Sequence, residues 1–475
     1  SMYIINIVMS EVNQLQADKT IGALSPPNIL SPNFYNDTLS VEIETVILDT
    51  GSFSFVKDGS STARWELPKK AVLNKNCDLV FNLKWLGTND NTAGVGTGRR
   101  ACLAKQGGGL ACIKRCRLSA GGKLLQSVEK AGEYIYLKSY CYQPYEHRRA
   151  VSDLFNGGNS AYSIDVYGEE AWDEERRDRG DLVNGVEILV RLQDLFPMLN
   201  DVEIPTGLLN QHLLVEVDFE TAFANVFTEI GSTGWNADNR NFEITRPRLL
   251  LDYIHYPIPV MENLQSLYQG GGEEINFRDM VLVKKSHAGG TTTHDVGMAQ
   301  ELVSKIYIQK LDSTKNERIS LCHGMRSDYR AGESYNFQIN NRQVYPRDID
   351  NVAEKYSYLS QTNPRPFRSL MGMYETDGTD ATTGNNFMRS TANFGGFGVN
   401  IQNDQIADAF QGSQQYIGIN LGSYRADDDS PLNATKVQNS PIIVRYTATD
   451  ACELNYYIEK AKKLSIRGGE VGVVG

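Results

Sequence analysis

Two blocks of alternating apolar residues recur along this chain at one fixed distance, and this repeat limits the fold more than any other feature. Residues 188–192 and 417–421 both carry Ile, Val or Leu at every second position. Residues 213–217 and 442–446 follow as a second matched pair, again 229 positions apart. A slip of one residue would turn the buried side of a strand outward. An offset that is kept over two strands therefore indicates one β-domain used twice.

The length and the composition agree with a duplicated β-domain. At 475 residues the chain exceeds the length at which one hydrophobic core stops growing, so two domains are expected. The chain has 24 Tyr and 42 Gly against only 4 Trp, which favours strands and turns. We therefore expect an all-β protein with a core in each half.

Proline and glycine divide the chain into segments. Pro26, Pro27 and Pro32 mark an N-terminal region with little periodicity, and Pro257 together with Gly270–Gly272 gives the clearest linker signal. The predicted units are an N-terminal arm (1–33), a first domain (34–257), a linker (258–272), a second domain (273–467) and a flexible C-terminal tail (468–475).

Several individual elements are predicted from local periodicity. Leu39, Val41 and Ile43 alternate with polar residues and predict a strand that buries this apolar side. Tyr-rich residues 134–142 predict an aromatic strand, and residues 349–359, which follow Pro346, have helical spacing. The segments predicted as long loops are 88–122, 153–181 and 361–436.

The net charge of the chain argues against nucleic acid as a binding partner. The formal charge is −11 at pH 7, whereas proteins that grip phosphate backbones neutralise them with Lys and Arg. No stretch approaches the roughly 20 apolar residues of a membrane span. We expect a soluble, unsecreted protein without sequence-specific nucleic-acid binding.

The seven cysteines do not form a recognisable framework. Their number is odd and no small-domain disulfide spacing is present, so free thiols are expected. Cys112 and Cys116, with Cys102 and His147 nearby, offer a weak zinc alternative. A structural zinc site normally takes four ligands in tight pairs, so we predict no metal and no cofactor.

One short motif has a catalytic appearance. Asp49-Thr50-Gly51 matches the local signature of aspartic proteases, in which paired carboxylates share one proton. A single-chain enzyme of that type needs a second such motif, and this sequence has none. His287 and His294 flank two glycines and are expected to be solvated loop residues. No catalytic residue is predicted, and the chain is not expected to be an enzyme.

The order of these elements resembles that of a known family. Residues 188–197 predict a strand and a short helix, residues 213–219 a further strand, and residues 335–346 a strand that leads into a helix. This pattern resembles the double-jelly-roll major capsid proteins of icosahedral double-stranded DNA viruses, the group with adenovirus-like, virophage and polinton-like members. The resemblance spans residues 34–467 and implies two tandem eight-stranded jelly rolls with short helices in the connecting loops.

The resemblance also implies a function. Such a chain is expected to form a homotrimer, which is a pseudo-hexagonal capsomer of the viral shell, with the long loops forming the outer tower. Its partners would be neighbouring capsomers, penton proteins and minor or cement capsid proteins, and its place the virion, after assembly inside the host cell. Residues Ile466-Arg467-Gly468-Gly469 before Glu470 resemble a cleavage site of the adenovirus-type maturation protease.

A carbohydrate-active protein is the alternative interpretation. Two tandem jelly rolls also suit a lectin or a glycan hydrolase, and Trp172 and Trp235 lie near acidic residues in predicted loops. A hydrolase would need two carboxylates at a defined separation. Glycan binding or hydrolysis would favour this alternative.

Overall fold

The computed structural model describes the strands and short helices of both halves of the chain. The described residues are 41–50, 54–55, 61–86, 100–103, 108–142, 186–230, 241–270, 272–312, 333–351, 354, 357–358, 361–362, 417–422, 430–448 and 451–474. The predicted N-terminal arm and the predicted loop at 153–181 lie outside them.

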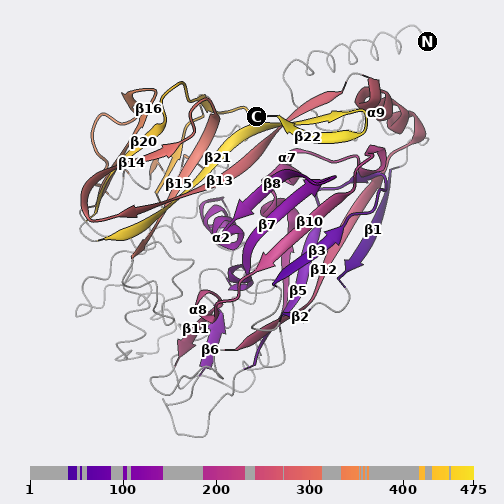
Figure 1. Ribbon diagram of the computed structural model, residues 1–475, viewed down its shortest axis with the longest axis horizontal. Coiled ribbons are helices and arrows are strands. Elements are labelled where there is room, and N and C mark those ends of the chain that lie inside the picture. Colours follow the sequence, from indigo (N-terminus) through magenta and orange to yellow (C-terminus); the bar gives the residue numbers. More distant parts are fainter. Residues whose placement is uncertain are drawn as a thin grey trace, which may run out of the picture.

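The first domain is a sandwich of two antiparallel sheets (Figure 1). One sheet has the order β1 (Glu42–Asp49), β12 (Phe242–His255), β5 (Asp78–Trp85), β9 (Val186–Arg191), and β2 (Ser54–Phe55) and β4 (Val72–Leu73) also pair with β12. The facing sheet has the order β3 (Thr62–Glu66), β10 (Leu213–Phe219), β7 (Ile113–Ala120), β8 (Lys123–Glu129). A separate ribbon pairs β6 (Arg100–Leu103) with β11 (Phe227–Ile230).

The second domain repeats this arrangement. Its larger sheet has the order β13 (Glu273–His287), β21 (Cys452–Arg467), β15 (Leu302–Asp312), β18 (Ile417–Asn420), with β19 (Thr435–Lys436) and β22 (Glu470–Val474) paired to β15 and β21. Its smaller sheet has the order β14 (Gly290–Gly297), β20 (Ile442–Ala448), β16 (Ser334–Ile339), β17 (Arg342–Gln343).

The repeat predicted from the sequence is confirmed at the level of sheet position. β9 and β18, which are 229 positions apart, each end the main path of a larger sheet. β10 and β20, at the same separation, are each the second strand of a smaller sheet. Each domain thus places the four main-path strands of its larger sheet against the four strands of its smaller sheet, which is the eight-stranded jelly roll that was expected.

Short helices connect the strands. They are η3 (Gly108–Cys112), α2 (Ala131–Tyr142), α6 (Leu192–Leu195), α7 (Pro197–Asp201), η5 (Thr206–Leu208), α8 (Phe223–Val226) and α9 (Ile258–Gly270). α9 occupies most of the predicted linker. Among the described residues, no helix combines the length and the apolar character needed to cross a bilayer.

Two hydrophobic cores hold the sandwiches together. The core of the first domain lies between its sheets, where the rings of Phe81 and Phe219 meet edge to face with centroids 5.1 Å apart. This core continues into the base of the second domain through residues such as Phe277 and Leu464. A smaller core, which includes Phe337 and Ile458, fills the second sandwich.

The predicted orientation of the first strand is wrong. Val41 and Ile43 were expected to be buried, but they are 40% and 62% exposed, and Ile47 is 63% exposed. Val46 and Leu48 pack against the core instead. β1 is an edge strand, so its alternation alone did not reveal which side faces inward; the register with β12 decides this.

The predicted aromatic strand is a helix. Ala131, Tyr134 and Ile135 are buried at helical spacing on α2. Gly132 allows this helix to approach the preceding turn, because a Cβ there would lie 1.8 Å from the carbonyl oxygen of Leu110. Tertiary packing thus overrides the strand propensity of the tyrosines.

Part of the predicted loop at 88–122 is a core strand. Cys116, Leu118 and Ala120 of β7 are buried, whereas Arg115, Arg117 and Ser119 between them are half-buried. This alternation of period two was present in the sequence, but the surrounding glycines hid it. β7 pairs with β10 in the centre of the smaller sheet.

Candidate functional site

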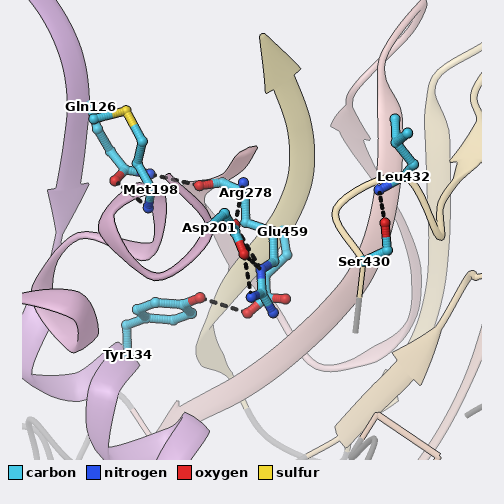
Figure 2. Close-up of polar contacts among 8 residues, drawn as sticks. All are labelled: Gln126, Tyr134, Met198, Asp201, Arg278, Ser430, Leu432 and Glu459. Carbon is cyan, nitrogen blue, oxygen red and sulfur yellow. Dashed lines mark hydrogen bonds and ion pairs between the residues drawn. The ribbon is translucent and has the colours of Figure 1, made fainter. Parts of the chain in front are cut away.

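Among the described residues, a polar cluster that joins distant parts of the chain lies between the two jelly rolls. The long strands β13 and β21 of the second domain run over α2, α7 and β8 of the first (Figure 1). Figure 2 shows residues that meet there, namely Gln126, Tyr134, Met198, Asp201, Arg278 and Glu459. The outer side of the second domain's larger sheet is therefore covered by the first domain.

An ion pair with two parallel contacts is at the centre of this interface. Arg278 on β13 contacts Asp201 at the end of α7, with Nη2 2.6 Å from Oδ1 and Nε 3.0 Å from Oδ2. The backbone amide of Arg278 also donates to Asp201 Oδ2 at 2.8 Å. Both side chains are buried, at 5% and 7% exposure. A buried pair of this kind is costly to break, because one charge would remain without its partner.

Gln126 links three elements through one amide group. Its Nε2 donates to the carbonyl oxygen of Arg278 at 2.9 Å and to Asp279 Oδ1 at 3.1 Å. Its Oε1 accepts from the backbone amide of Met198 at 3.1 Å. These bonds connect β8 to both α7 and β13 (Figure 2).

Two tyrosines extend the contact along β21. Tyr134 on α2 donates to Glu459 Oε1 at 2.6 Å, and Tyr457 donates to Glu133 Oε2 at 2.8 Å. The rings of Tyr134 and Tyr457 stack with centroids 6.1 Å apart. Burial raises the pKa of the Glu133 carboxyl, although Lys130 and the Tyr457 hydroxyl oppose this shift. This exchange of hydrogen bonds fixes the angle between the two domains.

The C-terminal segment also joins the domains, contrary to the prediction of a flexible tail. Gly468 and Gly469, at φ +60° and +79°, form a turn that returns β22 to pair with β21. Asn210 of the first domain donates its backbone amide to the Gly469 carbonyl oxygen at 2.7 Å and its side-chain amide to that of Gly468 at 2.9 Å. Val471 is buried in the first core. The glycines therefore make a tight hairpin and not a frayed end.

The predicted cleavage site lies in this hairpin. The peptide bond between Gly469 and Glu470 is at the turn, next to Asn210. Ile466 and Val471 on either side of the turn are fully buried. A protease that takes an extended substrate would reach this bond only after β22 separates from β21.

The two histidines that were expected to be solvated are buried. His287 is 2% exposed and His294 is 7% exposed, at the junction of β13 and β14. His287 Nδ1 lies 3.1 Å from His294 Nε2 and 2.6 Å from Thr292 Oγ1, while His287 Nε2 lies 3.1 Å from the carbonyl oxygen of Gly290. Burial lowers the pKa of both imidazoles. The hydrogen bond to Gly290 opposes this shift at His287 and Lys310 adds to it, whereas His287 and then Lys285 lower the pKa of His294 further. The pair is a neutral, hydrogen-bonded unit of the second core.

Other candidate residues do not assemble into a site. Asp49 ends the edge strand β1, and Thr50 Oγ1 donates to the carbonyl oxygen of Pro247 at 3.0 Å. Cys112 and Cys116 are fully buried free thiols in the core. In the described part of the chain, no three His, Cys, Asp or Glu side chains are placed to hold a metal ion. His147, Trp172 and Trp235 lie outside the described residues, as does the Cys102 side chain.

Sequence reasoning missed the interface residues. A signal was present, because Arg278 and Asp279 stand between the apolar residues Phe277 and Met280–Val283. Charged residues in such a position are seldom fully buried without a partner. Their partners, Asp201 and Gln126, gave no signal in the sequence.

Comparison with known proteins gives no sequence relative. No protein-family model matches this chain, and no curated protein matches its sequence. Similarity is found among solved structures instead.

Three solved viral structures share the architecture. A chain of the Sputnik virophage matches with a TM-score of 0.54 at 11% identity, covering 91% of this chain and 88% of its own length. The major capsid protein of Faustovirus matches at 0.51 and 9% identity over 98% of both chains. The major capsid protein of mavirus matches at 0.50 and 12% identity over 91% of this chain and 90% of its own. The chain therefore has the double-jelly-roll fold of viral major capsid proteins.

Proposed function

We propose that this protein is a major capsid protein that forms a homotrimeric, pseudo-hexagonal capsomer of an icosahedral viral shell. The observation that carries the proposal is the rigid pairing of two equivalent jelly rolls through buried polar contacts such as Asp201 with Arg278. Three such pairs around a threefold axis place six similar domains in a ring. The function follows from this packing and requires no catalytic site.

Symmetry gives a physical reason for the trimer. A jelly roll leaves sheet edges and broad sheet faces that have to be covered. Closed rotational symmetry covers them without open-ended growth. β1 is such an edge, and three exposed apolar side chains lie on it or next to it, namely Val41, Ile43 and Ile47.

The proposal includes the place and the partners of the protein. It would reside in the virion after assembly in the host cell. There it would contact neighbouring capsomers, penton proteins and minor or cement capsid proteins. The net charge of −11 agrees with a shell protein that makes no sequence-specific contact with the genome.

The test is the native mass of the purified protein, combined with negative-stain imaging. We expect a particle of three times the chain mass of 53.0 kDa with a hexagonal outline. A stable monomer across the micromolar range would contradict the proposal.

Maturation cleavage at the bond between Gly469 and Glu470 is a separate proposal. It requires opening of the hairpin made by β21 and β22. Mass spectrometry of the chain from mature particles tests it: loss of the last six residues supports cleavage, and an intact C-terminus contradicts it.

A further inference from the structure

The outward side of the first domain's larger sheet is open and partly apolar. Ile43 and Ile47 on β1 lie opposite Ile254 and Leu250 on β12, so that all four side chains project to the same side. Ile43 and Ile47 are 62% and 63% exposed, and the two β12 residues are half-buried. We call this side of β1 and β12 the outer face. In Figure 1, β1 lies at the edge of the first domain opposite α2 and β8, the elements near the second domain.

The equivalent face of the second domain is covered. β21 holds the place in its sheet that β12 holds in the first, and its outward residues are Asn455, Tyr457 and Glu459. All three are fully buried, and Tyr457 and Glu459 form hydrogen bonds with α2 of the first domain. One sheet of this type is therefore already covered by a neighbouring jelly roll, whereas no jelly roll in the described part of the chain covers its counterpart.

We propose that the outer face of the first domain binds the second domain of another copy of this chain. This inference rests on the proposed capsomer and names the surface that closes it. Within the chain, one domain binds the other through two different surfaces, and the same contact would recur between chains. Such a head-to-tail contact produces a closed ring when a whole number of its rotations adds up to 360°.

The second domain offers a matching side. Within the chain, β8 and the following α2 of the first domain cover the larger sheet of the second domain. In the second domain, β17 holds the position in its sheet that β8 holds in the first. Both residues of β17, Arg342 and Gln343, are exposed, and Val344 after it is 39% exposed. β17 and Val344 thus form the matching edge, which we expect to lie on the outer face.

Charge supports this assignment. Asp78 and Asp252 project on the same side of the sheet as Leu250. Burial raises the pKa of the Asp78 carboxyl and Asp252 raises it further, while Arg191 opposes the shift. Arg342 forms no ion pair with any residue that the structure describes. A cation from β17 of another copy would therefore complement the two carboxylates.

A hollow on the same side of the sheet gives the docking partner a place to insert. It measures about 400 Å³ and is lined by Asn82, Glu187, Thr245, Arg246 and Arg248. Arg246 has φ +50° and is followed by Pro247. A positive φ is unfavourable for a residue with a side chain, and a following proline favours an extended backbone instead. The Arg246 side chain is exposed at this hollow, so its guanidinium group is accessible to a docking partner.

The first experiment separates the surface from the capsomer itself. Light scattering is measured for the full chain, for Ile43→Asp with Ile47→Asp, and for the control Leu432→Asp, an apolar residue that is 41% exposed in the second domain. We expect trimers for the unchanged chain and the control, and loss of the trimer for the double variant. Circular dichroism with cooperative thermal unfolding verifies that the double variant is folded.

Each outcome has a distinct meaning. A folded double variant that remains trimeric overturns the inference about the outer face and leaves the proposed function intact. A monomeric unchanged chain overturns the proposed function and the inference together. If the double variant does not fold, Arg246→Gly is used, because it relieves the backbone and still removes the guanidinium; it is expected to raise the dissociation constant of the trimer at least tenfold, and an unchanged constant overturns the inference.

A charge exchange tests which part of the partner is bound. Asp252→Arg and Arg342→Asp are each expected to weaken the trimer, because like charges then meet. Asp252→Arg together with Arg342→Asp is expected to restore it. Two weakened single variants without rescue would overturn the pairing of β17 with the outer face.

Discussion

The two larger sheets of this protein have the same strand order but opposite surroundings. Residues 277–280 of β13 and 454–461 of β21 are buried without a break, and Arg278, Tyr457 and Glu459 point into the first domain. β1 and β12 are buried on one side only, and Ile43 and Ile47 point into solvent. The same sheet therefore forms a contact within the chain in the second domain and an exposed surface in the first. The following variants test this difference.

The largest effect is expected from breaking the buried ion pair. Asp201→Ala should lower the free energy of unfolding by about 3–5 kcal/mol, because Arg278 would remain buried without its partner. The matched control is Glu187→Ala, which removes the exposed pair of Glu187 with Arg248 on the open sheet. This control should cost about 1 kcal/mol or less. Urea unfolding of both variants measures the difference, and equal costs would contradict the comparison.

A smaller effect is expected from a single hydroxyl group. Tyr134→Phe removes the hydrogen bond to the Glu459 carboxylate at the covered sheet. The expected loss is about 1.5–3 kcal/mol, since the acceptor is a buried charged group. Thr45→Val is the control, because Thr45 donates to Asp252 on the exposed sheet and its loss should be nearly neutral. Thermal unfolding at matched concentration distinguishes the two variants.

Removal of the last strand should have an effect of about 2 kcal/mol. A chain that ends at Gly469 lacks β22 and leaves the site of Val471, which is 1% exposed, without its side chain. Full burial of a valine contributes about 1.5–3 kcal/mol. Replacing Val473, which is only partly buried, by Ala is the milder control. Equal stability of the truncated and the complete chain would show that β22 does not join the domains.

The smallest effect is expected from pH, and it should be confined to the second domain. The pKa values of His287 and His294 are lowered by burial, so the neutral pair stabilises the fold fully above the unfolded-state pKa near 6.5. That stability is lost as the pH falls through the lowered folded-state values. The groups around the pair are Lys285, Lys310, Glu333, Tyr446, Tyr456 and Cys452.

The first domain offers the contrast for the pH experiment. Its described histidines, His212 and His255, are about half exposed and lie next to Glu66 and Glu44. Amide hydrogen exchange at pH 7 and pH 5 should show faster opening at β13 and β14 in acid. His294→Gln should reduce this change, and exchange that accelerates equally in both domains would contradict the assignment.

The repeat was predictable from the sequence because the alternation of apolar and polar residues in a strand can be recognised without knowing which strands pair with it. The blocks at 188–192 and 417–421 fall on equivalent strands, and so do those at 213–217 and 442–446. Their inward residues are fully or almost fully buried in both domains. The expectation for His287 and His294 failed because a glycine-rich neighbourhood resembles a loop, whereas the hairpin of β13 and β14 brings both rings into the core.

The sequence by itself determined the number of domains, their β character and the equivalence of their halves, because alternating burial leaves its trace in the order of residues. Tertiary structure alone decided which faces are covered. The outward sides of β12 and β21 both combine apolar with polar residues, and only the packing of α2 against β21 buries one of them. Contacts such as those of Asp201 with Arg278 and of Asn210 with Gly469 join residues 77 and 259 positions apart, and no local pattern encodes a pair at such distances.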